Sequence, residues 1–471
     1  MTGSAAVPAP PALGPTKARR RRARAEPFSS PIEDLDHDGR GVARNDGKVT
    51  FVHGALPGEQ ITARVYRRKP KYDEAQLLEV ETASAERVQP RCAHFGVCGG
   101  CALQHLKRAA QLRHKQAGLL ENLERIGAVR PESVMIPIAA EPYGYRRRAR
   151  LGVKYVAAKG GVLVGFRERR APYIAVLEGC DVLAPEFARR IVDLREALSA
   201  MDARARIPQL EIAVGESAAA MIVRHLDPLT PADIAALERF GRTHAIQIHL
   251  QPGGPETVTA LEPVNAALLS YRLPAHDIRL EFGPTDFVQV NAAVNEQLVD
   301  RVLDGLALST GSERVLDLFC GLGNFTLPIA RRVHTVHGVE GARALVTRAR
   351  ANAKLNKLTN ASFSVADLNY AEPVASLFTP AGSVVAFDRV LLDPPRAGAA
   401  AMCEGLALVQ ARHTDAALPR RIVYVSCHPA TLARDAGSLV NELGYTLVEA
   451  GVADMFPHTA HVESMAVFER R

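Results

Sequence analysis

One cysteine of this sequence lies where its thiol could attack a substrate. In the stretch YVSCHPATL, an apolar run ends at Cys427, and Pro429 then prevents the strand from continuing. A free cysteine is more often a small buried hydrophobic residue, so its position alone leaves two interpretations open, a packing residue and a nucleophile. The residues around it in the fold must decide between them.

Three more cysteines lie close together in the segment PRCAHFGVCGGCALQH. They are Cys92, Cys98 and Cys101. Cysteines in this CxxxxxCxxC spacing are hard to explain as core residues, and they predict a metal site. The expected fourth ligand is Cys180, the only other cysteine before the C-terminal domain. Four thiolates suit both zinc and an iron–sulfur cluster, and His94 or His105 could complete a Cys3His zinc site instead.

Acidic residues end three successive strands that the C-terminal sequence predicts. Glu340 ends TVHGVE, Asp367 follows ASFSVA, and Asp393 ends RVLLD. Open parallel sheets bind ligands at the carboxyl ends of their strands, and an acid that ends the second strand can accept the ribose hydroxyl hydrogens. The turn in DLFCGLGNFTLPIA lacks the third glycine of GxGxxG, which weakens a dinucleotide site and fits S-adenosylmethionine. We therefore expect a nucleoside site, with Asp367 beside the adenine.

The elements that must position these residues predict an α/β protein of several domains. From about Asp286 to residue 471, strands and helices alternate as βαβα, which is typical of a doubly wound, Rossmann-like parallel sheet. Residues 27–88 contain short alternating runs broken by Gly and Pro, which indicate a small OB-like β-barrel with a basic, partly aromatic face. Residues 89–285 mix helical and strand-like stretches and predict a central α+β domain that contains the cysteine group. Residues 1–26, rich in Pro, Ala and Arg, are expected to form a disordered basic tail.

The positive charge of the chain is concentrated in two places. The net charge is +7 over 471 residues, yet residues 1–26 carry +5 and residues 142–170 carry +8, which leaves −6 for the rest. Two dense basic patches on an acidic remainder predict a polyanionic partner such as RNA, although a single charged run is usually solvated surface. No apolar run reaches the ~18 residues of a membrane span, and the Pro-broken N-terminus lacks the apolar stretch of a signal peptide. We therefore expect a cytoplasmic protein with reduced cysteines and no membrane partner.

Five motifs together resemble the RNA uracil-5-methyltransferase family. They are DFVQVN, DLFCGLGNFTLPIA, LLDPPRAG, YVSCHPATLARD and FPHTAHVESM, and the resemblance runs from about Phe28 to the C-terminus. The small barrel is similar to a TRAM domain, an RNA-binding module. The barrel and the four cysteines are similar to features of the branch that methylates uridine in large-subunit ribosomal RNA. The transfer RNA branch resembles this chain only outside the barrel and the four cysteines.

This resemblance implies roles for particular residues. The four cysteines would ligate a [4Fe-4S] cluster, and S-adenosylmethionine would be the methyl donor. The residues that match the methyl-donor site of the family are Gln289, Phe319, Asn324, Glu340, Asp367 and Asp393. One departure is His428, which stands where the family motif usually has Asn after the nucleophile.

The chemistry that this resemblance implies gives Cys427 a function. Uracil C5 is a poor carbon nucleophile, so a thiolate must first add at C6 before C5 can attack the methyl group. A base must then remove the C5 proton before the thiol can leave, and Glu463 in HTAHVES matches that base. His458 and His461 are the alternatives. The target base must also leave its stack to be reached, which implies base flipping.

Other functions remain open on the sequence alone. An adenine-N6 or cytosine-C5 methyltransferase would share the sheet, but the first needs no cysteine nucleophile and usually has an aromatic residue where this chain has Arg396. A transfer RNA uracil-5-methyltransferase is a further alternative. So is a non-catalytic RNA-binding or assembly factor, which the glycine turn and Cys427 disfavour. Cys320 and Cys403 have no nearby base in the pattern and are interpreted as packing residues, and we expect a monomer.

Overall fold

The computed structural model describes residues 25–262, 267–379, 387–413 and 418–470. The basic tail predicted for the first 26 residues therefore lies outside the described residues, except for its last two. The chain divides into two compact units, Met1–Asp34 with Gly41–Ala83 and Leu35–Arg40 with Ser84–Arg471.

The first unit is a curled sheet of short strands. The strands are β1 (Pro27–Pro31), β2 (Asp34–Leu35), β3 (Gly41–Asn45), β4 (Lys48–His53), β5 (Gln60–Arg68) and β6 (Asp73–Thr82). They are ordered β1-β5-β6-β4-β3-β2, and β1 also contacts β3, so the sheet curls as the predicted small barrel requires. Strand β5 alternates along its length and buries Ile61 and Val65 in the core. Its last residues, Tyr66, Arg67 and Arg68, are exposed and form part of the predicted basic and aromatic face.

The central part of the second unit is built on a six-stranded sheet in the order β13-β12-β11-β10-β8-β9. Its elements are β8 (Arg148–Val156), β9 (Gly161–Gly165), α2 (Pro185–Ala188), α3 (Ile191–Ser199), β10 (Gln209–Val214), β11 (Ala219–Arg224), α4 (Pro231–His244), β12 (Ile246–Gln251) and β13 (Thr259–Ala260). Helix α4 begins where the sequence supplies a capping box, because Thr230 Oγ1 accepts from Asp233 N and Asp233 accepts from Thr230 N. Helices α3 and α4 bury Leu194, Leu198 and Leu237 in one core with the sheet.

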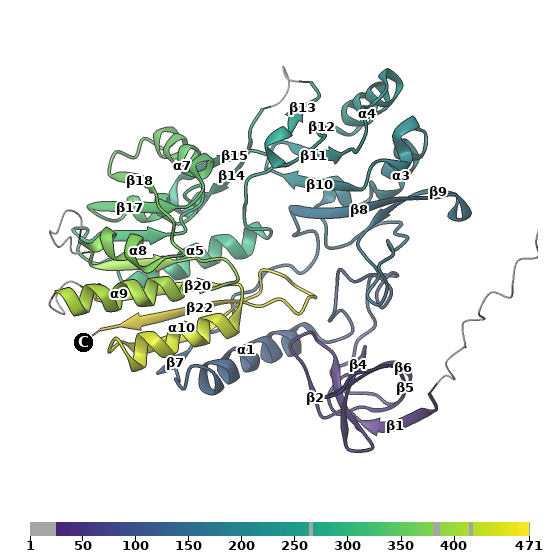
Figure 1. Ribbon diagram of the computed structural model, residues 1–471, viewed down its shortest axis with the longest axis horizontal. Helices are drawn as coiled ribbons and strands as arrows, with labels where there is room; N and C mark the ends of the chain where they lie inside the picture. The colour runs from purple at the N-terminus through teal and green to yellow at the C-terminus, as the bar shows by residue number, and fades with distance from the viewer. Residues whose placement is uncertain (1–24, 263–266, 380–386, 414–417, 471) are drawn as a thin grey trace, which may run out of the picture. The chain divides into compact units, whose positions relative to one another are not determined.

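The C-terminal part of the second unit is the predicted doubly wound sheet, seen with its flanking helices in Figure 1. Its strands are β16 (Arg314–Leu318), β17 (Thr335–Glu340), β18 (Ala361–Val365), β19 (Arg389–Leu392), β20 (Arg421–Ser426), β21 (Thr446–Ala453) and β22 (Glu463–Glu469). Its helices are α5 (Ala292–Leu306), α6 (Thr326–Ala330), α7 (Arg343–Leu355), α8 (Ala371–Phe378), α9 (Ala400–Arg412) and α10 (Pro429–Asn441). Strands β16 to β20 are parallel, and β22 pairs antiparallel with β20 and β21.

The strand order places a ligand site at the middle of this sheet. The order is β18-β17-β16-β19-β20-β22-β21-β7, where β7 is Ser133–Val134, so the chain runs outward from β16 to β18 and then returns to the other side of β16. Ligands of open α/β sheets bind at such a reversal, beside the carboxyl ends of the strands. The ends of β16, β17, β19 and β20 are therefore the expected location of the site.

Segments from earlier in the sequence complete the C-terminal part. They are α1 (Arg108–Arg125), β7 (Ser133–Val134), β14 (Leu269–Leu273) and β15 (Ile278–Phe282). Helix α1 contacts α10 and β21, and β7 adds a strand at the edge of the sheet. The predicted central domain, residues 89–285, thus contributes elements to the C-terminal sheet, and the predicted domain boundaries stay predictions.

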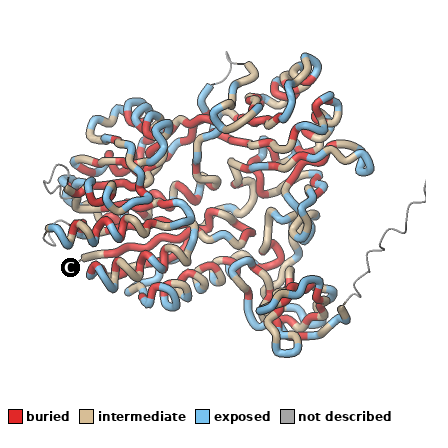
Figure 2. The backbone as a smooth tube through the Cα atoms, viewed as in Figure 1, coloured by how far each residue is buried: buried red, intermediate tan, exposed pale blue. Residues whose placement is uncertain are grey.

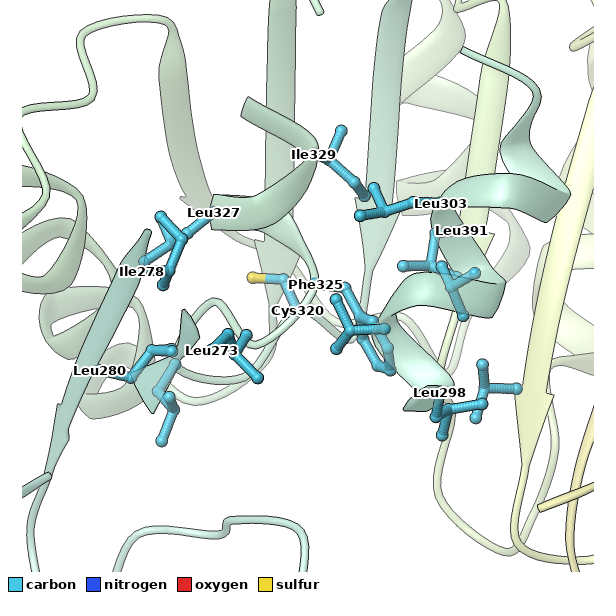
Figure 3. Close-up of a cluster of buried hydrophobic side chains, with 14 of the residues drawn as sticks. Leu273, Ile278, Leu280, Leu298, Leu303, Cys320, Phe325, Leu327, Ile329 and Leu391 are labelled. Carbon is cyan, nitrogen blue, oxygen red and sulfur yellow. The ribbon is translucent and has the colours of Figure 1, made fainter. Parts of the chain in front are cut away.

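Two hydrophobic cores cover the two faces of this sheet. Strands β19, β20 and β22 are almost entirely buried, and the interior of the C-terminal part is largely red in Figure 2. In one core, the thiol of Cys320 lies among apolar side chains from the β14–β15 hairpin and from α6, including Leu280 and Leu327 (Figure 3). Cys403 is buried in the other core. Both cysteines therefore lie where packing residues are expected.

Candidate active site

The turn after β16 has a backbone conformation that favours glycine. Phe319, Gly321 and Gly323 have positive φ angles of 65°, 55° and 98°. A residue other than glycine keeps such a conformation only where its surroundings hold it. The amide of Cys320 donates to the carbonyl oxygen of Val339 at 3.1 Å, which ties the turn to β17. Phe319 is thereby fixed at the carboxyl edge of the sheet.

The carboxylate of Glu340 is held by two backbone amides at the end of β17. Glu340 Oε2 accepts from Gly321 N at 3.2 Å, and Glu340 Oε1 accepts from Ala342 N at 3.0 Å. Each carboxylate oxygen has further lone pairs, so both can still accept hydrogens from a ligand. The side chain therefore has a fixed orientation at the switch point and joins the glycine turn to β17.

A group of carboxyl groups gathers at the ends of β16, β17 and β19. Burial raises the pKa of Asp393 to about 7. Burial also raises the pKa of Asp317 to about 7, and the nearby carboxylates of Asp393 and Glu340 add to this shift, while a hydrogen bond from Thr326 opposes it. Like charges this close together disfavour each other's ionised form, and a positively charged ligand relieves that repulsion. The electrostatics of the site therefore favour a cation.

The side chain of Asn324 is largely used in contacts within the protein. Asn324 Oδ1 accepts from Tyr271 Oη and from Asn295 Nδ2, both at 2.9 Å, and Asn324 Nδ2 donates to Asn295 Oδ1 at 2.9 Å. An amide oxygen has two lone pairs, so only one N–H of Asn324 remains for a ligand. Tyr271 and Asn295 position the glycine turn, and no motif in the sequence indicated them.

Two predicted donor-site residues are not joined to this group. Asp367 lies two residues beyond β18, is exposed, and its Oδ1 accepts from Asn369 N at 3.0 Å and Asn369 Nδ2 at 2.8 Å. Gln289 is half-buried between β15 and α5, two residues before Asn291, the N-cap of α5. In the described part of the chain, no hydrogen bond connects Gln289 or Asp367 to Glu340 or Asp393.

Cys427 and Glu463 lie at neighbouring ends of two paired antiparallel strands. The register pairs Ser426 with Ser464, and Ser464 Oγ donates to Ser426 O at 3.0 Å. Cys427 directly follows Ser426 and Glu463 directly precedes Ser464, so the two residues lie at neighbouring strand ends, and the charge of Glu463 acts on the Cys427 thiol. Cys427 is half-buried, whereas Glu463 is buried. A thiol and a carboxyl group therefore meet at the carboxyl edge, beside β19.

The pKa shifts of these two groups agree with this proximity. Burial, followed by the charge of Asp393, raises the pKa of Glu463 well above its ordinary value. Burial also raises the pKa of Cys427, with further increases from Glu463 and Asp393, while the guanidinium of Arg396 lowers it. Arg396 is thus a cation that favours the thiolate. The sequence pointed to Arg396 only through its position after Pro-Pro in the motif LLDPPRAG.

His428 performs the local function of the expected Asn. It is the N-cap of α10, and its Nδ1 accepts from Thr431 N at 3.3 Å. Its own backbone amide donates to Ser426 Oγ at 3.1 Å. Asn is a strong N-cap residue because its side-chain oxygen accepts this same type of hydrogen bond. The substitution therefore keeps the hydrogen bonding that fixes the chain after Cys427.

The two histidines that were alternatives for the base have other partners. His461 Nδ1 is 3.2 Å from Arg396 Nη2, which can only donate, so this nitrogen is the acceptor. Burial, with help from Arg108 and Lys115, lowers the pKa of His458 to about 4. His458 Nδ1 lies 3.3 Å from Gln111 Nε2. Both rings therefore have hydrogen-bond partners other than Glu463.

The four cysteines of the predicted metal site line one cavity. They are Cys92, Cys98, Cys101 and Cys180, and all are free thiols. His94 also lines it, but its Nε2 accepts from Glu178 N at 3.1 Å, and His105 is not among the lining residues. Burial raises the pKa of Cys101 to about 11 and that of Cys180 to about 12.

The chemistry of this cavity fits a four-thiolate centre. Cys98 Sγ accepts from Gly100 N at 3.4 Å, and Arg146 is among the lining residues. Backbone N–H groups and cations near the sulfurs stabilise the negative charge of such a centre. Within the described ranges, no three Cys, His or carboxylate side chains converge closely enough to hold a metal ion as they stand. A bound metal would therefore require the thiols to turn toward it.

The basic patch of residues 142–170 is divided between two surroundings. The exposed cations are Arg150, Lys154, Lys159, Arg167 and Arg170. Arg146 instead lines the cysteine cavity, and Arg169 donates to the carbonyl oxygen of Cys101. About half of this patch therefore faces solvent, and part of the rest surrounds the cysteines.

Comparisons with known proteins agree with this fold and site. Residues 264–471 match the family described as tRNA (Uracil-5-)-methyltransferase, and residues 31–78 match the TRAM domain. The protein named 23S rRNA (uracil(1939)-C(5))-methyltransferase RlmD of Alkalilimnicola ehrlichii is 50% identical over 452 residues, which cover 96% of this chain and 98% of that protein. The protein of the same name from Cupriavidus pinatubonensis is 50% identical, with 97% and 99% covered.

A solved structure extends the comparison to the fold. The tRNA (uracil-54, C5)-methyltransferase of Pyrococcus abyssi, in complex with S-adenosyl-L-homocysteine, has a TM-score of 0.69 and 24% identity. The alignment covers 94% of this chain and all of that one. At this identity, the likeness shows that the two proteins share a fold.

The fold, the acidic site and the comparisons define an S-adenosylmethionine-dependent RNA methyltransferase with an N-terminal TRAM domain. The chain belongs to the RNA uracil-5-methyltransferase family. Among the described residues, none of the helices has both the length and the apolar character needed to cross a bilayer.

Proposed function

We propose that this chain methylates C5 of a uridine in large-subunit (23S) ribosomal RNA. The substrate is supported by full-length relatives of this name at 50% identity, which share the barrel as well as the catalytic part. The single observation that supports the chemistry is the register of β20 and β22, which ends on the pair Ser426 and Ser464 and so leaves Cys427 and Glu463 at neighbouring strand ends. A thiol and a carboxyl group near each other are what addition to C6 and removal of the C5 proton require.

Cys427 is proposed as the nucleophile. Its sulfur forms a bond to C6 of the uracil, and the electron pair of the C5–C6 double bond then makes C5 nucleophilic. S-adenosylmethionine would supply the methyl group: C5 would form a bond to the methyl carbon as the bond from that carbon to the positively charged sulfur breaks, and S-adenosylhomocysteine would leave. Arg396 assists Cys427, because its charge lowers the pKa of a thiol that burial and two carboxyl groups raise.

Glu463 is proposed as the base that completes the reaction. It takes the C5 proton, the C5–C6 double bond forms again, and the bond between C6 and the Cys427 sulfur breaks. Burial gives Glu463 a pKa well above its ordinary value, which makes its carboxylate a stronger base than an exposed one. The histidines are weaker candidates, because His461 is bonded to Arg396 and His458 to Gln111.

The donor site is proposed at the carboxyl ends of β16 to β19. Glu340 would accept from the ribose hydroxyls, since both of its oxygens are oriented by backbone amides and keep free lone pairs. Asp393 and the carboxyl groups beside it would favour the cationic sulfur. Phe319 and Gln289 would line the site, Asp367 would lie beside the adenine, and Asn324 would offer its one remaining N–H.

The four cysteines are proposed to hold a [4Fe-4S] cluster. Support comes from the shared cavity, the N–H group directed at Cys98 and the cations Arg146 and Arg169 nearby. We also propose that the exposed basic residues of 142–170 contact the RNA backbone, that the target base is flipped out to reach Cys427, and that the chain acts as a monomer.

Mass mapping of methyluridine tests the proposed substrate. Ribosomal and transfer RNA are isolated from cells with and without this chain, and from cells with a Cys427→Ala variant. One methyluridine of large-subunit RNA should disappear in both mutants while transfer RNA keeps its own. Loss of a transfer RNA methyluridine instead would favour the transfer RNA activity, and no loss in either RNA would favour a non-catalytic factor.

A further inference from the structure

The loop that leads from β21 into Glu463 is anchored by residues of a distant segment. This loop, Asp454–Val462, is called the base loop here because Glu463 follows it directly. At its start, Asp454 is fully buried, and its Oδ1 lies 2.6 Å from Lys115 Nζ on α1. Arg108 of the same helix also pairs with Asp454. Lys115 Nζ further donates to Phe456 O at 3.1 Å, so α1 fixes the first residues of the loop.

The middle of the base loop is held by the segment that follows the third cysteine. The amides of Ala102 and Leu103 donate to His458 O at 2.8 Å and 2.9 Å. Gln111 Oε1 accepts from His458 N at 3.2 Å, and Gln111 Nε2 donates to Leu103 O at 2.9 Å. Ala102 follows Cys101 directly, so two consecutive peptide groups connect the cysteine cavity to the base loop.

Pro457, the residue before His458, has an anchor of its own. Tyr145 Oη donates to Pro457 O at 3.0 Å, and the ring of Tyr143 lies 4.7 Å from the ring of His458. His458 itself has a φ of 65°, a left-handed conformation that a residue other than glycine keeps only while its surroundings hold it. Loss of these anchors would let the backbone at His458 relax, five residues before Glu463.

The nucleophile does not depend on the same anchors. Cys427 follows β20, an interior strand that is paired on both sides by β19 and β22. The chain after Cys427 is fixed by the N-cap of α10. His461 of the base loop hydrogen-bonds Arg396 rather than Cys427 itself. Movement at His458 would therefore act first on Glu463, the first residue of β22, and leave the backbone at Cys427 in place.

We propose that the segment from Cys101 to Tyr145 positions Glu463 for removal of the C5 proton, so that the four-cysteine centre controls this late step and leaves methyl transfer unaffected. Gln111, Lys115 and Tyr145 are positioning residues in this scheme, since they act on Glu463 through the base loop. The inference rests on the proposed function, in which Glu463 is the base. It gives the cysteine centre a role in the reaction without electron transfer.

The test compares two steps of one reaction in the intact protein. Tyr145→Phe keeps the ring and removes one anchor, and Gln111→Met keeps the length of the side chain and removes the amide bonds. Tyr173→Phe is the matched control, because Tyr173 is an exposed tyrosine of the central part. Quenched reactions with methyl-labelled donor and an RNA fragment give the rate of methyl transfer and the fraction of methylated RNA that stays linked to protein on a denaturing gel.

Tyr145→Phe should slow release of the methylated RNA about fivefold, the factor that corresponds to one hydrogen bond of ordinary strength, while methyl transfer keeps its wild-type rate. Gln111→Met should slow release further, and Tyr173→Phe should behave as wild type. A Cys101→Ser protein should also accumulate linked RNA. Its amides at residues 458–462 should exchange hydrogen faster than in wild type, which is a readout independent of activity.

Four results would overturn the inference. Equal slowing of methyl transfer and release in Tyr145→Phe would make its contact merely structural, and this variant decides the matter even if Gln111→Met fails to fold. Unchanged exchange at residues 458–462 in Cys101→Ser would disconnect the cysteines from the loop. A Glu463→Gln enzyme that never stalls would remove the base and the inference together. If Glu463→Gln stalls and the positioning variants do not, only the inference is lost.

Discussion

Replacement of Glu340 by glutamine should weaken binding of the methyl donor without unfolding the site. In the wild-type protein, the carboxylate accepts from Gly321 N and Ala342 N and leaves lone pairs for the ribose hydroxyls. Glu340→Gln keeps the size of the side chain and one acceptor oxygen. It replaces the other oxygen by an N–H donor, which loses one backbone contact and one ribose contact. Alanine would remove both backbone contacts and loosen the glycine turn, so glutamine is the cleaner change.

The size of the effect follows from the ribose contact. A hydrogen bond to a charged group contributes about 1.5 to 3 kcal/mol. A loss of this size weakens the donor Kd by roughly 10- to 150-fold. The lower half of this range is expected, because the oxygen that remains in Glu340→Gln can still accept one hydroxyl.

Isothermal titration calorimetry with S-adenosylmethionine and S-adenosylhomocysteine measures the effect. Glu372→Gln is the matched control, since Glu372 is an exposed acid of the same sheet domain whose ion pair with Arg412 lies at the surface. The control should bind both ligands as wild type does, because such surface pairs contribute little. If Glu340→Gln binds both ligands with wild-type affinity, the ribose site lies elsewhere and the assignment of Glu340 is wrong.

Three further predictions concern protonation, capping and metal. The free energy of unfolding should fall as pH rises from about 4 to 7, because the folded protein holds a proton on Asp317, with its pKa of about 7, that the unfolded chain has already released. Asp317→Asn should reduce this dependence on pH and raise the free energy of unfolding at pH 8 by at least about 1 kcal/mol, measured by urea unfolding. An unchanged dependence on pH would contradict the raised pKa of Asp317. In the same assay, His428→Ala should lower the free energy of unfolding by about 1 kcal/mol, while His428→Asn should stay within about 0.5 kcal/mol of wild type. Equal stability of all three proteins would show that the N-cap contributes nothing. Anaerobically purified protein should be brown and contain iron and acid-labile sulfide, and Cys180→Ala should lose both, whereas stoichiometric zinc without sulfide would refute the cluster.

The C-terminal sheet could be predicted because its strands are buried on both faces. Runs such as RVLDLF and RIVYVS are short, apolar and separated by helical stretches, and the structure confirms them as β16 and β20. Strand-like stretches could also be recognised in the central part of the chain, but the order of these strands in their sheet could not be predicted. Strand β11 pairs parallel with β12 and antiparallel with β10, and nothing in a single strand specifies its partners.

Elements whose pairing is remote in sequence were missed. Strand β7 has only two residues and exists because Ser133 and Val134 pair with Glu449 and Ala450, more than 300 positions away. Two residues cannot produce a recognisable alternation, so no local pattern predicts this strand.

In the candidate site, too, local features could be predicted from the sequence, and contacts between remote segments could not. Glu340 and Asp393 could be placed at strand ends from their positions in apolar runs, and the sheet brings them together. The proximity of Cys427 and Glu463 depends on the register of β20 and β22, and the sequence motifs that contain these residues do not determine that register. The amide pair of Asn324 and Asn295 depends on how α5 packs against the glycine turn, so sequence reasoning could not reveal that Asn324 is largely occupied.

The division of labour between Cys427 and Glu463 is the central claim, and mass spectrometry of protein-linked RNA tests it most directly. Cys427→Ala and Glu463→Gln are each incubated with methyl donor and an RNA fragment, denatured and analysed for a covalent adduct. Glu463→Gln should yield protein linked through Cys427 to an RNA that already contains the added methyl group, because only proton removal is blocked. Cys427→Ala should yield no adduct and no methylated RNA. A Glu463→Gln enzyme that turns over normally, or a Cys427→Ala enzyme that still methylates uridine, would contradict the account.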